Sequence, residues 1–223
     1  MKNVRIFLFA ASVVLAAAPA LGQNQVQNSG FDIVPMLMNW SAYASSAPDP
    51  VGAGTGVWDG TQDVSMSPLS GSAHIDFAAA PTGGNAAYGI RQCVDLSALQ
   101  PVMTATFGTR YEVRTGQTAT GGVNVGIDVA FFDAVGCGGN LITGGSQGKD
   151  ILMADLMDNF WDTAEILSPA FDISPLPSPM SAEVRLIATR TSMNSDTLSV
   201  FFDGAYLAVN GALPVQLQTF EAE

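Results

Sequence analysis

Residues 123–131 read Val-Asn-Val-Gly-Ile-Asp-Val-Ala-Phe, and this stretch decides the fold class. Its bulky apolar side chains, from Val123 to Phe131, fall on every second residue. Successive side chains of a β-strand point to opposite faces of the sheet. The period of two therefore predicts a half-buried strand, with one face in the core and one face polar.

The same period recurs along most of the chain. It is found in residues 73–77, 88–94, 104–114, 184–189 and 198–203. Turn-forming clusters rich in Gly, Pro and Asn separate these segments, at residues 81–85, 121–122, 138–140, 144–145 and 174–179. Short alternating strands between such turns are typical of an all-β sandwich or barrel.

The N-terminus has the three parts of a secretory signal peptide. Lys2 and Arg5 precede an apolar run at residues 6–18, and the small residues Ala20 and Gly22 follow. This pattern predicts export with cleavage before Gln23, although an uncleaved anchor is the alternative. We expect a signal peptide at residues 1–22, one domain at 23–210, and a tail or trailing strand at 211–223. The destination is the periplasm or the medium, and no later segment is long enough to span a membrane.

Composition narrows the class of partner. Hydrophobic residues make up 48% of the chain and charged residues 13%, which is not the composition of a disordered protein. The formal net charge of −12 repels phosphate backbones and anionic lipid, so we expect no nucleic acid partner. The same charge attracts cations, and we expect a monomer.

The chain has two cysteines, Cys93 and Cys137. In an exported protein they are most simply one disulfide, closing a loop of about 45 residues worth roughly 4 kcal/mol in the chain-entropy model. Two free thiols in a reducing compartment are the alternative.

An ordered set of short motifs resembles a known family. The set comprises residues 28–32 followed by Trp40, and then residues 71–75, 89–96, 110–113, 131–133, 136–137, 182–186 and 200–207. Together they resemble the galactose-binding-like jelly rolls, in particular bacterial carbohydrate-binding modules of the family 4/9/22 type, in the stand-alone variety with a Cys pair. The resemblance implies a two-sheet antiparallel β-sandwich (jelly roll) over almost the whole exported chain.

The resemblance also implies a structural calcium ion. By position, Asp32 and Asp203 would be its side-chain ligands, with backbone carbonyls beside them. The sequence departs from the family here, because Asn28 is followed by Ser29 and Asp203 by Gly204 rather than a second acid. Calcium takes six to eight oxygen ligands. The alternative is that both acids accept hydrogen bonds from turn amides.

Aromatic side chains are the candidates for a sugar-binding platform, because their flat faces pack against pyranose rings. We expect Trp40 in the core. Trp58, in a Gly-rich stretch, and Tyr88 are the predicted platform, with Arg91 or Gln92 as polar partner. The alternative is that these residues simply pack.

No catalytic motif is evident. His74 is the only histidine and lies in an alternating segment, which favours a packed or surface imidazole over a triad member. We therefore expect a non-catalytic, exported carbohydrate-binding module. The rivals are a structural or adhesive surface protein with the same fold and no sugar site, and a module that binds another protein.

Overall fold

The computed structural model describes residues 23–32, 37–44, 54–67, 70–77, 86–115, 123–152, 160–166, 179–190 and 198–210. The predicted signal peptide (1–22) and tail (211–223) lie outside these residues. Within them, no helix is both long and apolar enough to cross a membrane.

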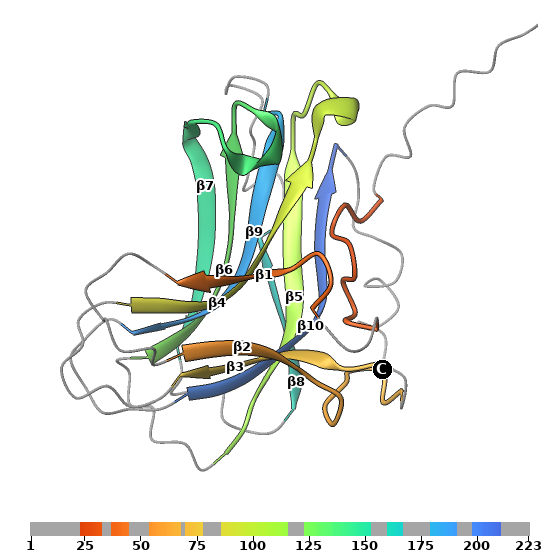
Figure 1. Cartoon of the computed structure of the whole chain (residues 1–223), viewed down its shortest axis with the longest axis vertical. Helices are drawn as coiled ribbons and strands as arrows, with labels where there is room; N and C mark the ends of the chain where they lie inside the picture. The colour runs from red at the N-terminus through yellow and green to blue at the C-terminus, as the bar shows by residue number, and fades with distance from the viewer. Residues whose placement is uncertain are drawn as a thin grey trace, which may run out of the picture.

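The described residues form two five-stranded antiparallel sheets, as predicted (Figure 1). The first sheet contains, in spatial order, β1 (Ser41–Ala44), β4 (Ala86–Asp95), β9 (Ser181–Arg190), β6 (Val123–Phe132) and β7 (Leu141–Leu152). The second contains β2 (Gly54–Asp59), β3 (Ser72–Phe77), β10 (Leu198–Val209), β5 (Ala105–Val113) and β8 (Trp161–Ile166). Among the described strands, β2–β3 and β6–β7 are the only pairs that are successive in sequence and lie in the same sheet. Such repeated crossing between two sheets is the jelly-roll arrangement.

The core lies between the sheets and is built by the period of two. Within β6, the side chains of Val125, Ile127, Val129 and Phe131 are at most 1% exposed. In β9 and β10, which lie inside their sheets, nearly all described residues are buried. Trp40 belongs to this core at 8% exposure, as expected. Every strand predicted from the alternation is present.

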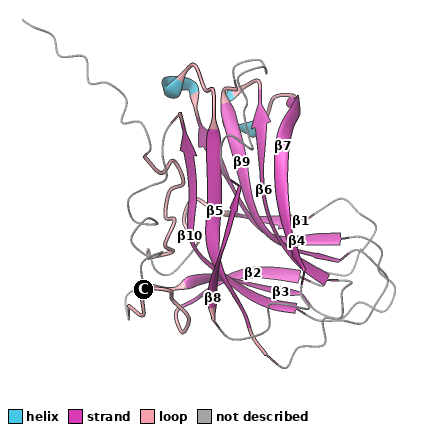
Figure 2. Ribbon diagram, turned by 180° about the vertical axis from the view of Figure 1, so that it is seen from behind, coloured by secondary structure: helices cyan, strands magenta, loops and turns pink. Residues whose placement is uncertain are grey.

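Two short 3-10 turns, η1 (Ser97–Leu99) and η2 (Val135–Cys137), lie at one end of the sandwich (Figure 2). The predicted disulfide is confirmed there: Cys93 of β4 bonds Cys137 of η2, with a Cα–Cα distance of 5.9 Å. Since β9 lies between β4 and β6 in the sheet, the bridge straps these strands together across β9. Ser181 of β9 holds the same turn, because its Oγ accepts from the Cys137 amide at 3.0 Å and donates to the Ala134 carbonyl at 2.6 Å.

A β-bulge in β10 and the N-terminal segment fit together. The register of β10 against β5 shifts between Asp203 and Tyr206, where Gly204 has φ +57°. Glycine adopts this left-handed conformation without steric cost. Beyond the bulge, residues 24–29 run beside β10 (Figure 1). The Gln25 amide donates to the Leu207 carbonyl at 2.8 Å, and the Ala205 amide donates to the Ser29 carbonyl at 3.0 Å.

Candidate functional site

A polar cluster crosses the outer face of the first sheet. The strand register places Arg91 of β4 opposite Arg185 of β9, and Arg185 opposite Asp128 of β6. Glu183 lies two residues before Arg185, on the same face of β9. Tyr43 of the edge strand β1 lies near both arginines. We call these five residues the outer cluster.

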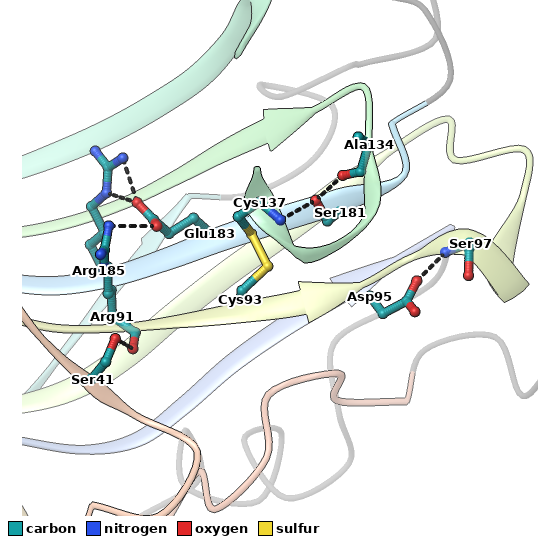
Figure 3. The surroundings of a disulfide bond; sticks show 10 residues. All are labelled: Ser41, Arg91, Cys93, Asp95, Ser97, Ala134, Cys137, Ser181, Glu183 and Arg185. Atoms are coloured by element: carbon teal, nitrogen blue, oxygen red, sulfur yellow. Dashed lines mark hydrogen bonds and ion pairs between the residues drawn. A yellow bond between two sulfur atoms is a disulfide. The ribbon is translucent and has the colours of Figure 1, made fainter. Parts of the chain in front are cut away.

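Glu183 bridges the two arginines, and Asp128 pairs with Arg185 alone. Arg91 Nη1 is 3.1 Å from Glu183 Oε2, and Arg185 Nη2 is 2.6 Å from Glu183 Oε1 (Figure 3). On its other side, Arg185 Nη1 is 3.5 Å from Asp128 Oδ2. Burial opposes the charge of Arg185, but Asp128 and Glu183 outweigh it and raise the pKa of the guanidinium. These ion pairs therefore hold the guanidinium and carboxylate groups in place.

The Tyr43 ring completes the outer cluster. Its centroid is 4.9 Å from Arg185 Cζ and 5.9 Å from Arg91 Cζ, which is within cation–π range. The Arg91 side chain is 45% exposed, whereas that of Glu183 is 8% exposed. The cluster thus presents one aromatic ring, guanidinium donors and carboxylate acceptors on a single surface.

Of the four residues predicted for sugar binding, the structure places only Arg91 in this cluster. Gln92 points inward at 3% exposure, and its side-chain amide accepts from the Gln27 amide and donates to the Gln27 carbonyl. Tyr88 is 8% exposed and packs in the core. Neither shares the outer face with Arg91.

Trp58 lies in the other sheet and is partly buried. Its Nε1 donates to the Phe31 carbonyl at 2.9 Å, and its ring fills the space that side chains at Gly60 and Gly71 would need. Together with Trp40 it lines a groove of about 630 Å³ at the edge between β1 and β2. Trp58 and Tyr88 are on different sheets.

The structure brings Asp203 together with a residue that sequence reasoning missed, Asp63. The two carboxyl groups lie close enough for each to affect the pKa of the other. Asp203 is 1% exposed, and burial, with Asp63 beside it, raises its pKa to about 8. Burial also acts to raise the pKa of Asp63, but bonds from Ser65, Ser67 and Ser70 outweigh it and lower that pKa. Asp32, the other predicted ligand, is an exposed residue next in the chain to Phe31.

Several oxygen atoms lie near the Asp63 carboxylate. Ser70 Oγ donates to Asp63 Oδ1 at 2.9 Å and lies 3.3 Å from the Gly30 carbonyl oxygen. Carboxylate, hydroxyl and carbonyl oxygens are the ligands calcium prefers. The predicted alternative also has support, since Asp203 accepts from the amides of Val64 and Gly204. Among the described residues, no group of three or more His, Cys, Asp or Glu side chains gathers as a metal site.

His74 meets a serine and an acid, but not as a triad does. Its Nε2 is 2.6 Å from Ser199 Oγ, while its Nδ1 is 3.9 Å from Asp59 Oδ2, beyond hydrogen-bond length. The Asp59 carboxylate instead accepts from the amide and hydroxyl of Thr61. The imidazole stacks on Phe201 at 4.4 Å, and burial lowers its pKa against the opposing effect of Asp76 and Asp59. The structure thus places His74 as a packed imidazole.

Comparison with solved structures shows that the chain has the fold of carbohydrate-binding modules. The tandem CBM22 domain of Paenibacillus barcinonensis Xyn10C matches with a TM-score of 0.50 and 12% identity, over 89% of this chain and 48% of that one. TmCBM61, solved with β-1,4-galactotriose, matches with a TM-score of 0.48 and 14% identity, over 85% of this chain and 100% of that one. The MgGH51 α-L-arabinofuranosidase matches with a TM-score of 0.48 and 12% identity, over 85% of this chain and 27% of the enzyme. No protein-family model and no curated protein matches the sequence.

Proposed function

We propose that this protein is a non-catalytic carbohydrate-binding module whose outer cluster binds a glycan outside the cytoplasm. The observation that carries the proposal is the gathering of Tyr43, Arg91 and Glu183 on one sheet face. Sugar sites combine a flat aromatic face with a few oriented polar groups. The ion pairs fix the guanidinium and carboxylate groups in advance, so binding a glycan costs little side-chain ordering.

A polysaccharide and glycan array with matched variants tests the proposal. Arg91→Ala and Tyr43→Ala remove the exposed cation and the ring, and each should weaken retention of the best-bound glycan roughly tenfold or more. Thr163→Ala, on the exposed face of the second sheet, is the control and should bind as the unmodified protein does. If no glycan is retained, or if all three variants bind equally, the outer cluster is not a sugar site.

The same array tests the other sequence predictions. Trp58→Phe, Tyr88→Phe and Gln92→Leu keep most of the packing volume at each position. Because these side chains are partly or fully buried, we expect glycan retention to be unchanged in all three. Loss of retention in a folded Trp58→Phe protein would move the site to the groove at β1 and β2.

The rival function is a structural or adhesive surface role without a sugar site. It is favoured by the mutual pairing in the outer cluster, where each carboxylate already has an arginine partner. If this rival is correct, Arg91→Ala should lower the unfolding temperature with no glycan retained by either protein.

We also propose that calcium binds at Asp63 and Asp203, with Asp63 rather than Asp32 as the second side-chain ligand. A cation between the two carboxylates would offset the repulsion that their close approach creates. Adding calcium should raise the unfolding temperature, a chelator should reverse the rise, and Asp63→Asn should abolish the response. Asp32→Asn is the control, since it lies outside the pair. An unchanged midpoint in calcium and in chelator would exclude the metal.

Export is part of the proposal. The Cys93–Cys137 bridge fits an oxidising compartment. Mass spectrometry of the secreted protein should find Gln23 as the first residue, and a retained residue 1–22 segment would contradict the signal-peptide interpretation.

A further inference from the structure

A second cavity lies on the outer face of the opposite sheet. It has a volume of about 720 Å³ and opens between β5, β8 and the loop of residues 60–67. Ligand pockets typically span about 300–1,000 Å³, so the space suits one or two sugar units. The outer cluster lies on the other sheet and contributes no residue to it.

The floor of this cavity combines an indole with a charge pair. The strand register places Trp161 of β8 directly opposite Glu112 of β5. Glu112 is 5% exposed, and its Oε1 is 3.6 Å from Nε of Arg114, whose side chain is 44% exposed. Arg110 of β5 holds the backbone at Trp161 in place, because its Nη2 donates a hydrogen bond to the Trp161 carbonyl oxygen at 2.9 Å. The floor therefore offers an aromatic face, a carboxylate acceptor and a guanidinium donor.

The wall of the cavity is held in place by its own hydrogen bonds. Asp63 accepts from the Ser67 amide and from the hydroxyls of Ser65 and Ser70. The Val64 amide donates to Asp203 Oδ2 at 3.0 Å, which ties the loop to β10. Met66, at 90% exposure, lines the cavity from this loop. Contact with a ligand would remove this exposed apolar side chain from water, which is favourable.

We infer that this cavity is a second carbohydrate-binding site, specific for an uncharged sugar. Glu112 and Arg114 already pair with each other, and the Asp63 carboxylate in the wall already accepts three hydrogen bonds, so a charged ligand would have to displace one of these partners. A neutral sugar can donate a hydroxyl to Glu112 and accept from Arg114 while its apolar face packs on Trp161. The inference stands apart from the function proposed for the outer cluster, since the two sites use different strands.

Two sites on opposite faces would let one protein molecule bind two glycan chains at once. The two faces of a sandwich point in opposite directions, so one glycan segment of a few sugars cannot reach both. Each protein molecule would then join two glycan chains, which suits an adhesive role as well as a binding module.

Indole resonances of the ¹⁵N-labelled protein test this second site directly. The probes are xylohexaose and β-1,4-galactotriose, and Trp161→Phe assigns the Trp161 indole signal. We expect this signal to shift saturably with at least one probe, and to shift equally in Arg91→Ala. Glu112→Gln should weaken that response roughly tenfold or more. The Trp58 indole, which is hydrogen-bonded to Phe31, is the internal control and should not move.

The outcomes separate this inference from the proposed function. A Trp161 signal that neither probe shifts, in a protein whose dispersed spectrum shows it folded, overturns the second site whatever the outer cluster does. A response that Glu112→Gln leaves unchanged also overturns it. If the Trp161 signal responds and Arg91→Ala retains glycans on the array as well as the unmodified protein does, the second site is supported and the proposal for the outer cluster is contradicted.

Discussion

Removing the Cys93–Cys137 bridge should destabilise the protein by about 4 kcal/mol. The cysteines are 44 residues apart in sequence, so the bridge closes a loop of that size in the unfolded chain. In the chain-entropy model the cost of such a loop is a constant plus 1.5R ln n, which gives about 4 kcal/mol at 25 °C. The native contacts around the bridge survive its loss, because Ser181 still bonds the Cys137 amide and the Ala134 carbonyl.

The assay is urea unfolding of the Cys93→Ser/Cys137→Ser double variant beside the oxidised protein. With an m-value near 2 kcal/mol/M, the midpoint should fall by about 2 M. The oxidised protein treated with a reductant should unfold like the double variant, which controls for the serine substitutions. A loss below about 1 kcal/mol, or a reduced protein as stable as the oxidised one, would refute the reasoning that the bridge acts on the unfolded chain.

Three further predictions concern single residues. Gly89→Ala should cost about 1–3 kcal/mol in chemical unfolding, because the added Cβ would clash with the Leu186 carbonyl oxygen. Gly138→Ala should cost nothing measurable, because its Cβ would lie 4.0 Å from the Gly136 carbonyl oxygen, an ordinary contact distance. Gln92→Leu leaves the Gln27 amide and carbonyl without their partner and should cost about 1–3 kcal/mol, with faster hydrogen exchange at Gln27. In chelator, the pKa of about 8 at Asp203 means that its protonated form is favoured in the folded state. The stability that protonated Asp203 contributes is therefore present below about pH 4 and is lost as the pH rises through 8. Asp203→Asn should remove this loss of stability at high pH. Equal profiles of unfolding free energy against pH for the two proteins would contradict the prediction.

The alternating strands could be predicted from sequence because burial of one face imposes a period of two. The strands that were missed lack this constraint. β7 contains Gly144, Gly145 and Gly148, and among the described strands it is the outermost of its sheet, next to β6. β2 is also an edge strand, and its Gly56 lies where a Cβ would be 2.7 Å from Ile90 Cγ2. Close packing selects glycine there, and glycine hides the strand pattern.

The candidate sites were harder to predict than the strands. Arg91, one of the two predicted polar partners of a sugar, is exposed, whereas Gln92 shares the inward face of Ile90 and Val94, and the alternation itself indicates this. The glycines near Trp58 suggested exposure, but Gly60 and Gly71 in fact make room for its ring. The pairing of Asp63 with Asp203 depends on a bulge and a loop that bring distant segments together, and no local pattern predicts such a contact.

The N-terminal segment beside β10 has a consequence for solubility. β3 pairs with β10 only from Leu198 to Phe202, so the main-chain groups of Ala205 and Leu207 would otherwise be an open strand edge. Residues 24–29 occupy that edge: Asn24 donates to the Ala205 carbonyl and accepts from the Leu207 amide, beside the two backbone bonds of Gln25 and Ser29. Open edges are where sheets of separate molecules join and aggregate. A variant that begins after residue 29 should therefore self-associate through this edge of β10. Residues 24–29 thus protect the protein from aggregation as well as forming part of the fold.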